Sequence, residues 1–138
     1  MVSLYCYETP ANLPATIHIK DARFILPIES TRYFRINGTP SLAHFTDYFR
    51  YIMFTRTNEI WIDTDLLLLK RFDLHEITYL AGKEAPDSVC NAILRLDSRD
   101  PRLTTPISRV EAMKENNINW GDTGPRLLTA RRSVAACS

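Results

Sequence analysis

The sequence predicts one domain of the α/β class. Apolar segments of strand length at residues 3–7 and 89–96 flank a segment at residues 41–55 that carries apolar side chains at helical spacing. The chain has 138 residues, enough for one hydrophobic core, and its 45% apolar and 24% charged residues are ordinary for a globular protein. We expect residues 1–130 to form this domain and residues 131–138 to form a frayed C-terminal tail.

The first half of the chain predicts a strand, a short extended piece and a long helix. The strand at residues 3–7 is followed by a loop with two prolines, and residues 17–27 predict an extended piece and at most one helical turn. Thr39 and Pro40 predict a helix start, with Thr39 as N-cap and Pro40 in the first helical position. The helix is expected to continue to Thr55. Its apolar positions at helical spacing are Leu42, Phe45, Phe49, Ile52 and Met53.

The second half predicts three strands and two helices. The strands are expected at residues 59–63, 77–81 and 89–96. One helix is predicted at residues 105–116 with Pro106 near its start, and a short helix with Pro125 in its first turn follows a loop.

Charge and cysteine content limit the classes of partner and compartment. The formal net charge of +1 argues against a nucleic-acid partner recognised through its phosphates, and no apolar run approaches the roughly 18 residues of a membrane span. The cysteines are odd in number and far apart, which is typical of free thiols in a reducing compartment. They are Cys6, Cys90 and Cys137. Since no export signal is recognisable at the N-terminus, we expect a cytoplasmic protein.

Two aspartates follow the apolar run at residues 60–62. If the segment stays extended, Asp63 and Asp65 point to the same face, and carboxylates about 6 Å apart repel by roughly 3 kcal/mol at an effective dielectric near 20. Mg²⁺ or Mn²⁺ would offset this repulsion, because both ions prefer oxygen ligands and share their coordination with substrate phosphates. The alternative is that one aspartate caps a turn and the other is solvated.

Asp47 and Arg50 form a second candidate pair. They are three residues apart in the predicted helix, and therefore lie on one face of it, at the edge of the apolar stripe. A solvated surface ion pair is the alternative, and such a pair contributes under about 1 kcal/mol.

The segment at residues 41–74 resembles the sugar-binding region of the DXD-containing glycosyltransferases, a group that includes mannosyltransferase-like and α-1,4-galactosyltransferase-like enzymes and, more distantly, the clostridial glucosylating toxins. The family pattern combines small-x-x-S/T-D-x-x-R-y with a later W/Y-x-D-x-D. The matching positions are Ala43, Thr46, Asp47, Arg50, Tyr51, Trp61, Asp63 and Asp65. The later stretches NAILRL and WGDTGPRLLT also resemble the family, so the resemblance covers roughly residues 41–129.

The resemblance implies a nucleotide-sugar transferase of the GT-A-like fold that retains the anomeric configuration and uses Mn²⁺ or Mg²⁺. It implies a nucleotide-sugar donor and a saccharide or other hydroxyl acceptor. The implied catalytic residues are Asp63, Asp65 and Asp122, with Asp65 as the metal ligand and Asp122 facing the acceptor hydroxyl. The implied donor-binding residues are Asp47, Arg50, Asp63, Asn91, Trp120 and Gly124.

The chain departs from the family pattern at two places. Asn58 and Glu59 stand where relatives carry paired glycines, and Glu59 would resist a positive φ. No segment like the family's I-P-x-x-I-H-x-x-W strand, which holds the base, precedes residues 3–7, so the expected fold lacks its first strand. Either the true start lies upstream or the chain is a shortened relative.

Other interpretations remain open from the sequence. A haloacid-dehalogenase-type phosphatase also places DxD after an apolar strand, but Leu67 stands where that class has threonine or valine. A truncated, non-catalytic binding or interaction module is the other functional alternative. Trp61 is expected in the core, Trp120 either packs on the helix at residues 105–116 or contacts a ligand, and Asp122 could cap the last helix instead. The three histidines are expected to be satisfied or solvated.

Overall fold

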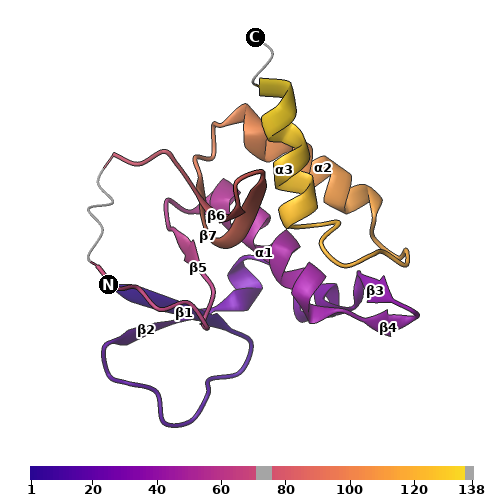
Figure 1. The fold of residues 1–138 in the computed structure, drawn as a ribbon. Coiled ribbons are helices and arrows are strands. Elements are labelled where there is room, and N and C mark those ends of the chain that lie inside the picture. Colours follow the sequence, from indigo (N-terminus) through magenta and orange to yellow (C-terminus); the bar gives the residue numbers. More distant parts are fainter. Residues whose placement is uncertain (71–75, 136–138) are drawn as a thin grey trace.

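The computed structural model describes residues 1–70 and 76–135, with side chains described as far as residue 130. It is a mixed α/β structure with three small sheets, as Figure 1 shows. The elements before the long helix are β1 (Val2–Cys6), β2 (Ile17–Asp21), the 3-10 helices η1 (Ala22–Phe24) and η2 (Ile28–Arg32), β3 (Arg35–Ile36) and β4 (Thr39–Pro40). The remaining elements are α1 (Leu42–Arg56), β5 (Trp61–Ile62), β6 (Tyr79–Ala85), β7 (Ser88–Leu96), α2 (Pro101–Ala112) and α3 (Pro125–Ala135).

The strands pair in three separate groups. β1 and β2 are parallel, β3 and β4 form an antiparallel hairpin, and β5, β7 and β6 form an antiparallel sheet in that order. Within the described ranges no ladder joins the parallel pair to the three-stranded sheet. The α/β class expected from the sequence is therefore confirmed, with its strands divided among small sheets.

Helix α1 is the centre of the hydrophobic core. Its residues are buried almost all round between His44 and Phe54, whereas the sequence predicted a single apolar stripe. Phe49 contacts Tyr5 of β1 at a ring-centroid distance of 5.8 Å and Trp61 of β5 at 6.1 Å. The side chain of Phe49 on α1 therefore contacts both the β1–β2 pair and the sheet that contains β5. Trp61 packs on the core, as predicted.

The predicted start of this helix was wrong by two residues. Thr39 and Pro40 form β4, and the N-cap position belongs to Ser41. Asn37 and Gly38, with φ of 50° and 80°, make the two-residue turn of the β3–β4 hairpin. An Asn-Gly pair favours this turn because both residues tolerate positive φ.

Helix α2, unlike α1, begins earlier than predicted. Asp100 caps it by accepting a hydrogen bond from the backbone N–H of Arg102 (2.8 Å), and Pro101 occupies the first helical position. Pro106 therefore lies inside the helix, where it is buried, rather than at the start. An aspartate followed by proline satisfies both requirements of a helix start, so it takes precedence over Thr105-Pro106.

The remaining predicted elements agree with the structure, with some differences in their bounds. β6 and β7 form a hairpin, and α3 begins at Pro125 and continues to Ala135, so helix extends into the segment expected to fray. Among the residues with described conformation, no helix combines the length and apolar character needed to cross a bilayer. Cys137 lies outside the described residues.

Glu59 connects the parallel strands to the segment that enters β5. Its carboxylate accepts hydrogen bonds from the Tyr5 hydroxyl (2.5 Å) and from Nζ of Lys20 (2.6 Å). Partial burial raises the pKa of Glu59, but the hydrogen bonds from Lys20 and Tyr5 outweigh it, so its pKa lies below the usual value. Neither Asn58 nor Glu59 has a positive φ, so the family's paired glycines are not needed here.

We predict that Glu59→Gln destabilises the protein by about 1 kcal/mol at pH 7, because a charged acceptor is lost at a partly exposed site. The folded-state pKa of Glu59 is lowered, so its contribution is present above the unfolded-state pKa and is lost as pH falls through the folded-state pKa. Urea unfolding at pH 7, 5, 4 and 3 should show the difference between wild type and variant shrinking with acid. Glu8→Gln, at an exposed position, is the control; an equal loss in both variants would contradict the prediction.

Candidate functional site

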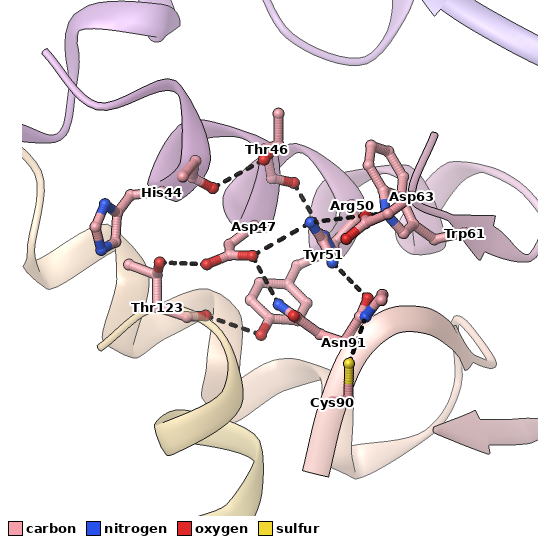
Figure 2. Close-up of polar contacts among 12 residues, drawn as sticks. His44, Thr46, Asp47, Arg50, Tyr51, Trp61, Asp63, Cys90, Asn91 and Thr123 are labelled. Carbon is pink, nitrogen blue, oxygen red and sulfur yellow. Dashed lines mark hydrogen bonds and ion pairs between the residues drawn. The ribbon is translucent and has the colours of Figure 1, made fainter. Parts of the chain in front are cut away.

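The candidate site is built around the carboxylate of Asp47, shown in Figure 2. Asp47 lies on α1 and is 8% exposed. Its Oδ1 accepts a hydrogen bond from Nδ2 of Asn91 on β7 (2.7 Å), and its Oδ2 accepts one from Oγ1 of Thr123 in the loop before α3 (2.6 Å). A buried carboxylate is tolerated when it is paired and hydrogen-bonded, and here the partners come from three separate parts of the chain.

Arg50 occupies the other side of Asp47. Its guanidinium is 4% exposed, and Nη2 lies 3.3 Å from Oδ1 of Asp47 and 3.4 Å from Oδ1 of Asp63. Nη1 donates to the backbone carbonyl of Asn91 (2.5 Å) and Nε to that of Thr46 (3.3 Å). The pair of Asp47 and Arg50 is therefore buried, and the surface ion pair considered from the sequence is wrong.

Asp63 lies where this buried network meets solvent. Its side chain is 31% exposed. Oδ1 accepts a hydrogen bond from Nε1 of Trp61 (2.5 Å), and the guanidinium of Arg50 lies 4.7 Å from the centre of the Trp61 ring. Both contacts fall on Oδ1, which is therefore held in place, and within the described part of the chain Oδ2 keeps its capacity to accept a hydrogen bond.

Asp65 does not share a strand face with Asp63, because the strand expected at residues 59–63 is shorter than predicted and the segment does not stay extended to Asp65. β5 ends at Ile62, and Asp63 continues the ladder only through its N–H, which donates to the carbonyl of Ala92 (2.7 Å). Thr64 and Asp65 lie in a turn, and Asp65 is exposed. The leucines that follow are also largely exposed. Leu67 is 79% exposed and Leu69 is 85% exposed.

Gly124 is required by the close approach of its loop to the network. A Cβ at this position would lie 2.6 Å from Nδ2 of Asn91 and 2.7 Å from Oδ2 of Asp47. A Cβ carbon essentially never lies this close to another heavy atom, so only glycine allows the neighbouring Thr123 to reach Asp47. The resemblance placed Gly124 at the site, and the geometry gives a packing reason for it.

Trp120 and Asp122 lie in the same loop but do not contact Asp47, Arg50 or Asp63 in the structure. Trp120 is 69% exposed, and its ring contact is with His44 of α1 at 5.8 Å. Oδ2 of Asp122 accepts a hydrogen bond from the backbone N–H of Asn119 (2.9 Å), and Oδ1 lies 3.4 Å from Arg126. Asp122 thus stabilises the loop, while its role toward an acceptor stays a prediction.

His44 is satisfied, as expected for the histidines. It is 1% exposed; Nδ1 lies 2.7 Å from Oγ of Ser41, and Nε2 lies 3.0 Å from the carbonyl of Asn119. The two contacts hold the start of α1 against the loop that carries Trp120. His44 is thus part of the support of the loop and is not a free base or metal ligand.

Thr123 was not identified from the sequence. It is fully buried, its hydroxyl binds Asp47, and its backbone carbonyl accepts a hydrogen bond from the hydroxyl of Tyr51 (2.9 Å). The one feature of the sequence that could have identified Thr123 as a site residue is its position between Asp122 and Gly124, in a stretch that resembles the family. No general pattern marks a threonine as the partner of a carboxylate 76 residues away.

Burial dominates the titration of the central carboxylate. It raises the pKa of Asp47, while Arg50 and the hydrogen bonds from Thr123 and Asn91 oppose the increase. Burial also raises the pKa of Tyr51, with the negative charge of Asp47 adding to the effect. The network is therefore an arrangement in which each polar partner offsets part of the cost of burying Asp47.

The oxygen donors suit a metal ion only in part. Within the described residues, no three His, Cys, Asp or Glu side chains are grouped closely enough to hold a metal ion. Asp65 supplies one exposed carboxylate, and Asp63 supplies one oxygen without a described partner. The exposed carboxylate of Asp65 suits a Mg²⁺ or Mn²⁺ ion whose coordination is completed by the phosphates of a ligand, whereas the guanidinium of Arg50, 3.4 Å from Asp63, opposes a cation at Asp63.

We predict that Thr123→Val destabilises the protein by about 1–3 kcal/mol at pH 7.5, because Oδ2 of Asp47 loses its partner while the side-chain shape is kept. The charged form needs this hydrogen bond most, so the variant should raise the folded-state pKa of Asp47 further. The loss of stability relative to wild type is therefore largest at a pH above the folded-state pKa of Asp47 in both proteins. It shrinks as the pH falls and Asp47 is protonated.

Urea unfolding at pH 7.5 and pH 5 measures this difference. Thr55→Val is the matched control, because the Thr55 hydroxyl binds only a carbonyl of its own helix at an exposed position. A loss in Thr123→Val no larger than in the control would show that the hydrogen bond to Asp47 contributes nothing to stability.

The comparisons with known proteins add no relative to this geometry: no protein-family model, no curated protein and no solved structure matches the chain. The function is therefore inferred from the residues and contacts of the site itself.

Proposed function

We propose that the protein transfers a sugar from a UDP- or GDP-sugar donor to a hydroxyl group of a saccharide or other acceptor, with retention of the anomeric configuration, in a GT-A-like domain. One observation supports this proposal above the others. Residues picked out by the family pattern and distant in the chain, from Asp47 on α1 to Gly124 before α3, converge on one buried network that ends in the half-exposed carboxylate of Asp63.

The network favours different roles for its inner and outer residues. Asp47 and Arg50 are too deeply buried to offer much surface to a ligand, so we assign them the positioning of Asp63. Trp61 and Arg50 both bind Oδ1 of Asp63 and fix its orientation. Oδ2 is then the atom that would accept a hydrogen bond from a ribose or sugar hydroxyl.

Asp65 is the proposed metal ligand. Asp47 and Asp63 both pair with the single guanidinium of Arg50, and the exposed Asp65 follows Asp63 by two residues, so negative charge exceeds positive charge in this part of the chain. A diphosphate would be repelled from such a surface. A bound Mg²⁺ or Mn²⁺ ion would neutralise this excess and stabilise the charge that develops on the leaving diphosphate.

The proposed reaction exchanges one bond at the anomeric carbon for another. The bond from the anomeric carbon to the diphosphate oxygen breaks, and its electron pair leaves with the diphosphate. The acceptor oxygen forms the new bond on the same face and loses its proton to the leaving phosphate oxygen. Asp63 would contribute by orienting the donor sugar, and the exposed Trp120, whose ring contacts His44 of α1, would offer a surface for the acceptor.

We predict that a UDP- or GDP-sugar raises the melting temperature only when Mn²⁺ is present. A ligand at 100 times its dissociation constant stabilises the folded state by about 2.7 kcal/mol. This stabilisation corresponds to roughly 3–5 °C for each kcal/mol in a domain of this size. Thermal unfolding with a panel of nucleoside diphosphate sugars, with and without Mn²⁺, measures the shift. Asp65→Asn should abolish it.

Asp87→Asn is the control for Asp65→Asn, because Asp87 is an exposed aspartate in the turn between β6 and β7. A response that is equal with and without Mn²⁺ would refute the role of Asp65. No response to any nucleotide sugar would favour the alternative of a binding or interaction module without transferase activity.

We predict that Asp63→Asn reduces donor affinity about 10–100-fold and leaves the folded state nearly as stable as wild type. The Asn Oδ1 can still accept from Trp61 and Arg50, while the outward oxygen becomes an N–H₂ group that cannot accept a hydrogen bond. Isothermal titration calorimetry with the donor that gives the largest thermal shift measures the affinity. Unchanged affinity in a folded variant would exclude Asp63 from the donor site.

A further inference from the structure

A hollow away from the network lies where β1, β2 and η1 meet the C-terminal end of α1. Its volume is about 460 Å³, within the range of small-molecule sites. The residues that line it include Tyr5, Ile19, Lys20, Phe24, Ile25 and Arg56. None of these residues belongs to the network around Asp47, so the proposed transferase chemistry leaves the hollow unexplained.

The hollow has apolar and aromatic walls. Ile25 is 3% exposed and belongs to the hydrophobic core, and the ring of Tyr5 packs against Phe49 beneath it. Phe24 is 77% exposed although it lines the hollow. An aromatic ring in this position offers a planar surface on which another ring could stack.

Arg56 gives the hollow an available positive charge. Its Nη1 donates to the backbone carbonyl of Phe24, and both residues line the hollow. Arg56 forms no ion pair with any carboxylate in the described part of the chain. The remaining donors of the guanidinium form a planar fork that suits a carboxylate or a phosphate.

The other charged groups at the hollow are already paired. Lys20 is bound by Glu59 (2.6 Å), and Asp21 caps η1 through the N–H of Arg23 and pairs with the guanidinium of the same residue. The charge left for a ligand is therefore that of Arg56. This charge is positive, and Arg56 lines the same hollow as the exposed ring of Phe24.

We propose that this hollow binds a planar aromatic anion, with the ring of the ligand against Phe24 and its carboxylate or phosphate on Arg56. The shared chemistry is that of an aromatic carboxylate or of a nucleoside monophosphate, which combine a planar ring with one anionic group. The inference does not depend on sugar transfer, because its contacts are separate from Asp63 and Asp65.

The test is a titration of the ¹⁵N-labelled protein followed by NMR, with 1-naphthoate, uridine 5′-monophosphate, uridine and inorganic phosphate as separate probes. We expect 1-naphthoate or the nucleotide, or both, to shift the backbone amide signals of Phe24, Ile25 and Thr57, and uridine and phosphate to bind at least roughly tenfold more weakly. Comparison of the naphthoate and nucleotide titrations shows whether the hollow prefers an aromatic carboxylate or a nucleoside monophosphate.

The variants Arg56→Gln and Phe24→Ser should each weaken binding about tenfold, since each removes one of the two contacts. Arg32→Gln, at an exposed arginine of η2 outside the hollow, is the control and should bind as wild type does. Thermal unfolding of each variant establishes that it is folded.

Two results of the titrations would overturn the proposal. One is the absence of shifts at these amides with both ring-bearing anions, and the other is shifts confined to the region of Asp63 and Asn91. A folded Arg56→Gln variant with wild-type affinity would also overturn it. Failure of the sugar transfer proposal, by contrast, leaves the naphthoate result unaffected.

Discussion

The buried carboxylate of Asp47 is the interaction on which the rest of the site depends. It joins α1 to β7 through Asn91 and to the loop before α3 through Thr123, and its partner Arg50 extends the connection to Asp63. A buried charge keeps its place only while its partners stay, because loss of one partner leaves an unsatisfied group. The same constraint explains Gly124, since any side chain there would displace Asn91 or Asp47.

Much of the fold could be predicted from local patterns, and the errors occurred where two local signals competed. The periodicity of residues 41–55 predicted α1, and the β-rich stretch at 89–96 predicted β7. Thr39-Pro40 resembles a helix start, but the Asn37-Gly38 turn before it requires a hairpin instead. The division of the strands into separate sheets could not be predicted, because strand pairing depends on tertiary contacts rather than on the local sequence.

The site was predictable only in part, and for a different reason. Asp47, Arg50 and Asn91 were identified through the ordered motif, whereas helical spacing alone allowed a surface ion pair for the first two. Thr123 carries no local signature of its role. The extended geometry assumed for Asp63 and Asp65 was wrong, because the strand ends at Ile62 and a turn follows. As a result, Asp63 is partly buried beside Arg50, whereas Asp65 is exposed to solvent.

This separation gives the two aspartates different electrostatic surroundings. Asp63 lies 3.4 Å from the guanidinium of Arg50, whose positive charge disfavours a cation at the same carboxylate, while it leaves a hydroxyl donor unaffected. Asp65 is exposed and has no cationic partner among the described residues. If the two aspartates bind a nucleotide sugar, Asp63 is therefore suited to accept a hydrogen bond from a hydroxyl group, and Asp65 is suited to bind the cation. The same division follows from the burial of Arg50, since a guanidinium fixed by Asp47 and by two backbone carbonyls cannot move away to admit a metal ion.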